Sequence, residues 1–366
     1  MSDIKKIREN INQIDKEIAK LFEERMKQSK EVANYKIKQA LPIEDLNREK
    51  EVIAKNVNLI EDSEIKDYYV DFMHSVMDIS KKYQYRLVEG MKIAYCGVEG
   101  AFAYIASKKI FNSQKLVSYP SFTAAYNAVV DGTCDACVLP LENSYAGDVG
   151  EVMDLLFSGS LFINNVINVE IVHNLIGING SSIDKIKTVL SHPQALEQCH
   201  KYIQTHNFKT LEYPNTAIAA KELASFNDET MAVIASKDVA DLYNLSILES
   251  NINESRNNTT RFAVFTKNIN TEKSPSKMGQ HFILVFTVLN EAGALAKPLN
   301  IIGAHGFNMR TLRSRPMKEL IWNYYFFVEL EGDINSADGQ DMLTQLRSVC
   351  DCLKIVGTYN SITKDK

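Results

Sequence analysis

Three cations lie on a stripe of the sequence that otherwise has the pattern of a buried helix face. The stripe starts at Ile4 and advances in alternating steps of four and three residues, which keeps its positions on one side of a helix. Its members are Ile4, Arg8, Ile11, Asp15, Ile18, Phe22, Arg25, Ser29, Val32 and Lys36. Burying a charge is costly unless an opposite charge meets it. The pattern therefore indicates a binding site for a small polyanion; the alternative is three long side chains that reach water from a bundle edge.

The spacing of these cations indicates how such a site is assembled. A helix from about Asp3 to Lys38 contains no Gly or Pro and would be roughly 50 Å long. Arg8 and Arg25 lie roughly 25 Å apart along it, whereas Arg25 and Lys36 lie about 16 Å apart and can bend toward one centre. We therefore expect an antiparallel dimer with intertwined N-terminal helices, in which Arg8 of one chain completes the site built by Arg25 and Lys36 of the other.

Two further helices in the first 89 residues, which contain no glycine, add polar groups. The second helix is expected to present Asp45, Arg48 and Glu49 on one face. The third carries Ser80 and Gln84 one turn apart on an otherwise apolar stripe. Together the three helices offer cations, carboxylates, a hydroxyl and an amide at inward positions.

Residues 1–88 resemble the all-helical chorismate mutase domain that is fused to other enzymes of phenylalanine and tyrosine synthesis. The matching segments are Ile7-Arg8-Glu9, Glu24-Arg25, Lys36, Asp45-Leu46-Asn47-Arg48-Glu49 and Ser80…Gln84. The residues that the resemblance implies at the carboxylates of chorismate are Arg8 of the second chain, Arg25 and Arg48. Those implied at its ether oxygen are Lys36 and Gln84, and those implied at hydroxyl or outer groups are Asp45, Glu49 and Ser80. The implied Claisen rearrangement needs a compact conformer and positioned donors, and no base, nucleophile, metal or cofactor.

Composition sets the limits for the whole chain. Its 366 residues are 45% hydrophobic and 24% charged, enough for two or three globular domains. The net charge of −5 gives no basic surface for nucleic acid. No apolar run is long enough to cross a membrane and the N-terminus is charged, so we expect a cytoplasmic protein. Cys134-Asp-Ala-Cys137 has the spacing of a metal or redox motif, but the lack of a second pair favours core thiols.

Glycine first appears at Gly90, and alternating strands and helices follow. The predicted strands are 92–96, 115–119, 134–139, 166–171, 188–190, 231–235 and 261–265, with helices near 122–130, 195–205 and 216–224. This alternation indicates α/β architecture, in which ligand sites lie off the carboxyl ends of strands. The polar clusters at strand ends are Gly97-Val-Glu-Gly100, Pro140-Leu-Glu142-Asn143-Ser144, Ser191-His192-Pro193-Gln194 and Asn258-Thr-Thr260-Arg261-Phe262. Each alone is typical of a turn or cap, but four together favour a binding cleft.

Residues 91–267 resemble the prephenate dehydratase family, whose two α/β lobes are similar to periplasmic binding proteins. The strongest matches are Pro140-Leu-Glu-Asn-Ser, Ser191-His-Pro-Gln and Thr260-Arg-Phe. The implied reaction removes carboxylate and hydroxide from prephenate and gives phenylpyruvate, with catalytic roles for Thr260, at the departing hydroxyl, and Glu142. Substrate contacts are implied for Asn143, Ser144, Ser191, Gln198 and Arg261. Because a threonine hydroxyl is a weak acid, we expect Thr260 to donate a hydrogen bond and relay a proton.

After a polar stretch at 268–280, which we expect to be a linker, the predicted elements are strand 281–289, helix 295–304, strands 307–313 and 321–330, helix 339–349 and strand 353–358. This βαββαβ order predicts a ferredoxin-like unit. Residues 281–361 resemble the ACT regulatory domain that follows prephenate dehydratases, and the matching motifs imply a phenylalanine site at Gly293, Ala294, Leu295, Ser314, Arg315 and Pro316. Arg313 stands where the family often has glutamate, so a purely structural dimerisation module is the alternative.

The leading interpretation is a multidomain, bifunctional enzyme of phenylalanine biosynthesis, an isomerase followed by a lyase. Its fold class combines an all-α domain, a two-lobed α/β domain and an α+β ferredoxin-like ACT domain, in a homodimer or higher homo-oligomer. An arogenate-preferring dehydratase stays open, because the two substrates differ only in a keto or amino group. Ala101 and Ala103 replace hydroxyl residues that the family usually carries in its first loop. A prephenate dehydrogenase is disfavoured because there is no strand–G-x-G-x-x-G–helix unit, and a non-catalytic amino acid sensor remains as the other class.

Overall fold

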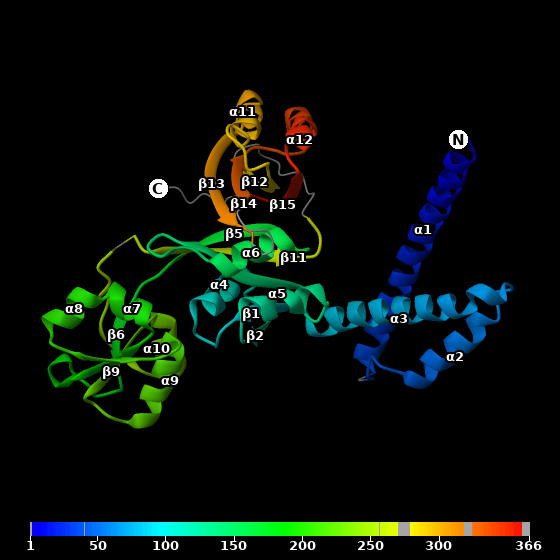
Figure 1. Cartoon of the computed structure of the whole chain (residues 1–366). Helices are drawn as coiled ribbons and strands as arrows, with labels where there is room; N and C mark the ends of the chain where they lie inside the picture. The colour runs from blue at the N-terminus through cyan, green and yellow to red at the C-terminus, as the bar shows by residue number, and fades with distance from the viewer. Residues whose placement is uncertain (1, 40, 256, 270–278, 318–323, 361–366) are drawn as a thin grey trace. The chain divides into compact units, whose positions relative to one another are not determined.

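The computed structural model describes residues 2–39, 41–255, 257–269, 279–317 and 324–360 (Figure 1). The chain divides into two compact units, Met1–Met91 and Lys92–Lys366. The first unit is helical. The second contains a ten-stranded and a five-stranded sheet.

The first unit consists of three helices, as the sequence predicts. Helix α1 spans Ser2–Lys38 without a break, α2 spans Leu46–Val57 and α3 spans Lys66–Glu89. The expectation of one long first helix is therefore confirmed. Its C-terminal part packs on α3 through buried Ala33, Met73, Val76 and Met77.

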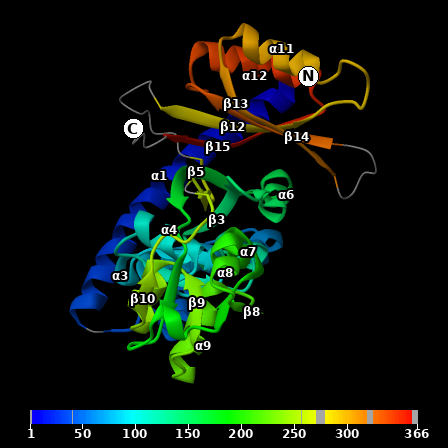
Figure 2. The same ribbon diagram turned by 90° about the vertical axis from the view of Figure 1, so that its left-hand side faces the viewer.

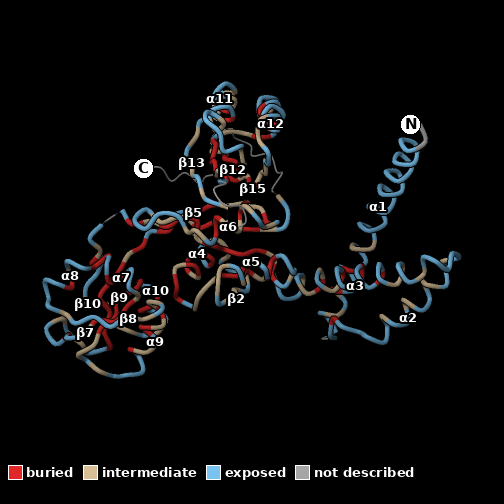
Figure 3. Tube along the Cα trace, in the orientation of Figure 1, coloured by how far each residue is buried: buried red, intermediate tan, exposed pale blue. Residues whose placement is uncertain are grey.

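The N-terminal part of α1 lacks such a partner within its own unit. All residues from 4 to 24 are exposed (Figure 3). They include a row of large apolar side chains. The most exposed of them are Leu21 at 64%, Ile14 at 55% and Ile4 at 53%. Because large apolar surfaces on helices are normally covered, this face is available for another protein surface.

The second unit begins with an α/β lobe built on one half of the larger sheet. Its strands are β1 (Lys92–Cys96), β2 (Lys115–Tyr119), β3 (Ala136–Asn143), β4 (Gly147–Asp148), β5 (Phe162–Glu170) and β11 (Thr259–Thr266). They follow the order β5-β11-β3-β1-β2, with β4 beside β3. Its helices are α4 (Phe102–Ile110), α5 (Phe122–Val130) and α6 (Gly150–Ser158). The chain leaves this lobe after β5 and returns to it at β11. In the sheet, β11 lies between β5 and β3.

The second lobe is inserted between β5 and β11. Its sheet has the order β10-β6-β9-β7-β8, formed by β6 (Asn174–Gly177), β7 (Thr188–Ser191), β8 (Lys209–Glu212), β9 (Met231–Ala235) and β10 (Ser246–Glu249). Its helices are α7 (Pro193–Gln198), α8 (His200–Thr205), α9 (Thr216–Phe226) and α10 (Lys237–Tyr243). The prediction of a single helix at 195–205 is thus wrong in one respect. The helix is broken at Cys199, whose backbone (φ −118°, ψ 17°) leaves the helical region while its thiol is buried.

The C-terminal part has the expected βαββαβ order. Its elements are β12 (Gln280–Thr287), α11 (Ala296–Ala304), β13 (Asn308–Pro316), β14 (Tyr324–Glu331), α12 (Ala337–Val349) and β15 (Cys352–Asn360). The strand order β13-β14-β12-β15 is that of a ferredoxin-like sheet, and both helices cover the same face (Figures 1 and 2). Most of the predicted linker, and residues 321–323 of the third predicted strand, lie outside the described residues.

The C-terminal sheet joins the first lobe through β15. Gly357 of β15 lies opposite Ile163 of β5 in a parallel pair. A Cβ atom at Gly357 would lie 2.5 Å from the carbonyl oxygen of Ile163, so this approach requires glycine. Behind the junction, Ile283 and Phe327 share one apolar core with Phe265 of β11. The two parts of this unit are therefore packed together over a common core.

Two expectations about composition can be compared with the structure. Cys134 and Cys137 are buried in the core of the first lobe and are free thiols, which confirms their prediction as core residues. Across the described ranges, none of the helices combines the length and the apolar character needed to cross a membrane.

Candidate active sites

In the helical unit, three predicted site residues meet between α1 and α3. The guanidinium of Arg25 donates hydrogen bonds to Ser80 Oγ and, at 3.5 Å, to the carbonyl oxygen of Val76. Ser80 in turn donates to the same carbonyl at 2.8 Å. Burial lowers the pKa of Arg25, and Gln84 is buried with no partner for Oε1 in the described part of the chain. These groups form a half-buried polar centre at the predicted place.

The other predicted residues of this unit make different contacts. Lys36 donates to the carbonyl oxygen of Ile43, and Glu49 accepts from Lys81 at 3.1 Å. The expectation that Asp45 shares a helix face with Arg48 and Glu49 is wrong, because Asp45 precedes α2. Its carboxylate caps that helix by accepting the backbone N–H of Arg48 at 3.0 Å. The exposed side chain of Arg48 pairs with Glu51 at 3.1 Å.

Arg8 lies apart from this centre, on the exposed N-terminal half of α1. The 17 residues that separate it from Arg25 correspond to roughly 25 Å of helix, as the spacing predicts. Within one chain the structure therefore brings together Arg25, Ser80 and Gln84 but not Arg8.

In the second unit, a cavity of about 450 Å³ is lined by both α/β lobes. Three predicted residues line it: Asn143 at the end of β3, Thr260 at the start of β11, and Gln198 at the end of α7. Ala101 and Ala103, the two departures from the family pattern, also line it. No lysine or arginine occurs among the lining residues that the structure describes.

A continuous chain of hydrogen bonds runs along the cavity wall. The amide nitrogen of Asn143 donates to Thr260 Oγ1 and to Asn258 Oδ1, both at 2.8 Å. The amide nitrogen of Asn258 donates to Gln198 Oε1 at 2.9 Å, and the same oxygen lies 2.9 Å from His173 Nε2. Asn143 Oδ1 is held by the backbone N–H groups of residues 145 and 146, each at 2.9 Å. The chain thus fixes the orientation of every side chain in it.

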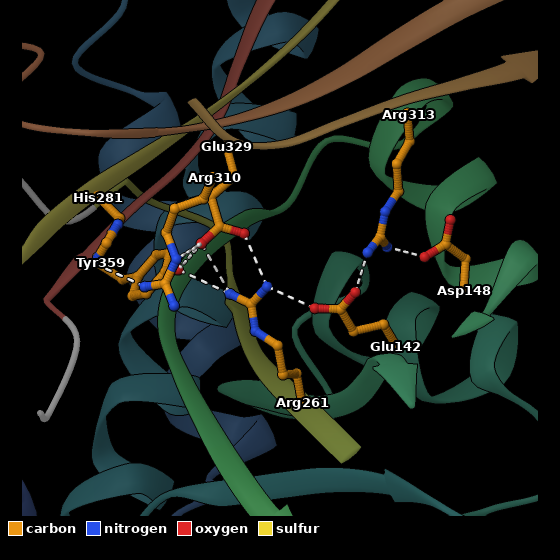
Figure 4. A network of polar contacts seen from close by, with 8 residues as sticks. All are labelled: Glu142, Asp148, Arg261, His281, Arg310, Arg313, Glu329 and Tyr359. Carbon is orange, nitrogen blue, oxygen red and sulfur yellow. Dashed lines mark hydrogen bonds and ion pairs between the residues drawn. The ribbon is translucent and has the colours of Figure 1, made fainter. Parts of the chain in front are cut away.

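Glu142 and Arg261 are placed differently from their sequence neighbours Asn143 and Thr260. Successive residues of a strand point to opposite faces, and neither Glu142 nor Arg261 lines the cavity. They belong to a cluster of ion pairs between the first lobe and the C-terminal part of the chain (Figure 4). Their predicted roles in the reaction stay predictions, and this placement does not favour direct contact with a substrate.

The ion-pair cluster connects the first lobe to the C-terminal sheet. Arg261 lies between Glu142, at 2.7 Å, and the fully buried carboxylate of Glu329 on β14, at 2.9 Å (Figure 4). It also donates to the Tyr359 hydroxyl at 2.9 Å. Arg313 pairs with Glu142 and with Asp148, a residue that lines the cavity. Arg313, which stands where the family often has glutamate, therefore contacts a residue that lines the cavity.

Charge pairing in this cluster outweighs burial. Burial raises the pKa of Glu142, but hydrogen bonds from Arg313 and Arg261 bring the pKa below its usual value. Burial likewise raises the pKa of Glu329, and the pair with Arg261 lowers it overall. Both carboxylates are therefore ionised at neutral pH, and Glu142 is not a proton donor there.

Two other predicted residues are used to hold the backbone. Ser144 Oγ donates to the carbonyl oxygen of Asn257 and accepts from the N–H of Thr259, both at 2.9 Å. Ser191 is fully buried and donates to the carbonyl oxygen of Ile234 at 2.6 Å. Neither lines the cavity.

The two motifs predicted to bind an effector lie at separate elements. Gly293, Ala294 and Leu295 form the turn before α11, where Gly293 has φ of +80°. Ser314, Arg315 and Pro316 end β13. Arg315 pairs with Asp154 of α6 at 3.4 Å, and the same carboxylate accepts from the Tyr325 hydroxyl at 3.0 Å. The second motif is therefore tied to the dehydratase-like lobe.

Sequence reasoning missed several cavity residues. His173 lies in the segment that connects the two lobes, and its ring packs edge to face against Phe102, which also lines the cavity. His192 and Gln194 also line the cavity; the sequence predicts a polar cluster there, but the predicted site residues of that region are Ser191 and Gln198. A lone histidine before a short apolar run gives no pattern that identifies a site.

The comparisons agree with this division of the chain. The chorismate mutase type II family matches residues 7–85, and the prephenate dehydratase family matches residues 93–270. The bifunctional chorismate mutase/prephenate dehydratase of Buchnera aphidicola subsp. Acyrthosiphon pisum is 31% identical over 97% of this chain and 95% of its own. Both halves and their order are thus found in one relative.

Two solved structures resemble the second unit. In each case the match covers at least 90% of the chain of that structure. GqqA, described as a novel type of quorum quenching acylase, is 28% identical with a TM-score of 0.69, over 75% of this chain and 100% of its own. A prephenate dehydratase from Arthrobacter aurescens in complex with L-Phe has a TM-score of 0.68 at 21% identity, over 74% and 90%. The second of these shows the fold alone.

Fold and sites together define a multidomain aromatic-biosynthesis enzyme, with a helical mutase unit before a two-lobed dehydratase and a ferredoxin-like C-terminal part. The chain belongs to the family of bifunctional chorismate mutase/prephenate dehydratases. Its two activities are those of an isomerase and a lyase in phenylalanine biosynthesis.

Proposed function

We propose that the dehydratase reaction takes place in the cavity of the second unit, with Thr260 at the departing hydroxyl of prephenate. The observation that carries this proposal is the hydrogen bond from Asn143 to Thr260 Oγ1. Because Thr260 accepts this bond, its own hydroxyl proton remains available to a ligand. The proton lost to the departing hydroxide is then replaced from solvent.

The carboxylates of prephenate would be held by helix N-termini. The cavity is lined by Phe102, the first residue of α4, and by Thr216, the first residue of α9. The N-terminal end of a helix presents free N–H groups and a positive dipole end, which suit an anion. Asn215 caps α9 and also lines the cavity. These ends supply the positive potential that the described lining side chains lack.

The mutase reaction is proposed for the centre formed by Arg25, Ser80 and Gln84, with Lys36 at its edge. Arg8 of a second chain would complete it, in a homodimer with antiparallel α1 helices. The proposal is supported by the exposed apolar face of α1, which extends from Ile4 to Leu21. A second copy of the same helix has the matching length and character to cover it.

Phenylalanine is proposed as the effector of the C-terminal part, residues 281–361, which follows the proposed domains at 1–88 and 91–267. The relative from Arthrobacter aurescens was crystallised with L-Phe, and Arg315 of the proposed site contacts α6 of the dehydratase lobe. Dehydratase assays with and without phenylalanine test this proposal. Inhibition supports it, whereas unchanged activity favours a structural dimerisation module.

One experiment tests both proposed reactions at once. Purified protein is given chorismate, and prephenate and phenylpyruvate are followed in time; sequential formation of both is expected. A parallel assay with arogenate compares turnover of the amino analogue with that of prephenate. Failure of both half-reactions would leave the amino acid sensor as the better interpretation.

A further inference from the structure

His173 is the last member of the hydrogen-bonded chain along the dehydratase cavity, and the chain determines which of its ring nitrogens carries the proton. Backbone N–H groups occupy Asn143 Oδ1, so its amide nitrogen faces Asn258. Asn258 must then offer its own nitrogen to Gln198, whose oxygen is the acceptor. An acceptor at 2.9 Å from Nε2 requires the proton of His173 to be on Nε2.

The other ring nitrogen, Nδ1, is consequently a bare acceptor. His173 is 2% exposed, and Nδ1 has no partner among the described residues. Burial lowers the pKa of His173 to about 4, so the ring is neutral at physiological pH. The backbone is also fixed, since its N–H donates to Asn253 Oδ1 at 2.6 Å and its carbonyl accepts from Ile252 at 3.0 Å. His173 lines the cavity, and an orphaned acceptor on such a residue indicates a missing donor.

We propose that His173 Nδ1 accepts a hydrogen bond from the ring hydroxyl of prephenate; this inference rests on the dehydratase reaction proposed above. At neutral pH prephenate carries two carboxylates, one ketone and one hydroxyl, so the hydroxyl is its single hydrogen-bond donor. A neutral acceptor nitrogen would repel the carboxylates, and among the groups of prephenate only that hydroxyl can satisfy it. His173 therefore identifies the leaving group, which neither Asn143 nor Gln198 does.

The proposed contact assists departure of the hydroxyl without proton transfer to histidine. When its proton is held by His173, the hydroxyl oxygen becomes a better acceptor for the Thr260 hydroxyl. The C–O bond then breaks as the oxygen gains a proton through Thr260 and leaves as water. The electron pair of the breaking C–CO2 bond enters the ring, and carbon dioxide leaves. His173 is neutral before and after the step.

Two substitutions separate the nitrogens of the ring. In His173→Gln the amide nitrogen takes the place of Nε2, so the bond to Gln198 is retained and the acceptor at Nδ1 is lost. In His173→Asn the amide oxygen takes the place of Nδ1, so the acceptor is retained and the bond to Gln198 is lost. We expect dehydratase kcat/KM to fall roughly 10- to 100-fold in His173→Gln and less in His173→Asn. Mutase activity and the thermal unfolding midpoint check that both variants are folded.

A prephenate analogue with hydrogen in place of the ring hydroxyl provides the decisive measurement. Its affinity, measured by calorimetry, should be the same for wild type and His173→Gln, while turnover of prephenate differs. An equal loss for analogue and prephenate, or a larger loss in His173→Asn, would overturn the proposal. Wild-type protein without dehydratase turnover would overturn the proposed function itself. Normal wild-type turnover with an unaffected His173→Gln variant would overturn this inference alone.

Discussion

Thr260 lines the cavity, and its hydroxyl is the group that we propose to protonate the oxygen leaving prephenate. In Thr260→Ala this donor is lost while the partner Asn143 remains, and we expect dehydratase kcat to fall about 100-fold or more. Thr260→Ser keeps the hydroxyl and should retain most of the activity. Chorismate mutase activity, measured on the same samples, should not change. Near-normal dehydratase turnover in Thr260→Ala would contradict the assignment.

Burial of neutral His173 has a consequence for stability in acid. Its pKa is about 4 when folded, against about 6.5 in an unfolded chain. Between these values the unfolded chain binds a proton that the folded chain does not, so stability falls as the pH is lowered from about 6.5 towards 4. This amounts to roughly 2 to 3 kcal/mol at pH 4.5. Urea unfolding of the second unit at pH 7 and 4.5 should show this loss, and His173→Gln should reduce it; equal acid sensitivity in both proteins would argue against this origin.

The sequence predicts several of the segments that line the candidate dehydratase cavity, but it does not predict which residues of those segments face the cavity. Thr260 and Arg261 are adjacent, and so are Glu142 and Asn143, yet one member of each pair points to the C-terminal sheet. A register shift between Arg261 and Phe262 changes the alternation locally. His173 was not predicted because its place in the cavity depends on partners, such as Gln198, that lie far from it in sequence.

At the scale of elements, the pair between Arg261 on β11 and Glu329 on β14 connects the first lobe with the C-terminal part of the same ten-stranded sheet. Glu329→Gln leaves the guanidinium buried without its main carboxylate, which should destabilise the second unit by about 3 kcal/mol. Arg310→Gln is the matched control, because Arg310 is 45% exposed and lies 4.0 Å from Glu329. It should cost less than about 1 kcal/mol. Denaturant midpoints of the two variants give the comparison. Equal destabilisation by both would show that burial does not determine how much the pair of Arg261 and Glu329 contributes to stability.

Most helices and strands could be predicted because their apolar periodicity extends over enough residues. The glycine-free helix α1 and the strand β9 follow the expected ranges closely. The four-residue strands β6, β8 and β10 do not follow from the sequence, because so short a run carries no measurable alternation; β7 has the same length but does match a predicted strand. The pairing of β15 with β5 depends on a single close approach at Gly357, which leaves no local pattern.

At the scale of the whole molecule, the mutase site should need two chains. Arg8→Ala and Arg25→Ala homodimers should each be weak. Co-expression of the two variants should restore one of the two sites in every heterodimer, because one site then receives Arg25 from one chain and Arg8 from the other. Mutase activity of the separated heterodimer is the measurement. A fully active monomer, or a heterodimer as weak as its parents, would contradict the shared site.

The junction between β5 and β15 also bears on how this protein could be divided. The sequence suggests a clean boundary near residue 268, but β5 has β11 on one side and β15 on the other. A chain cut at that boundary would remove the β15 partner of β5 at Ile163 and leave the backbone groups there free to pair with another molecule. It would also expose Phe265 and its apolar neighbours. The C-terminal part therefore acts as protection against aggregation for the lobe that precedes it, whatever else it binds.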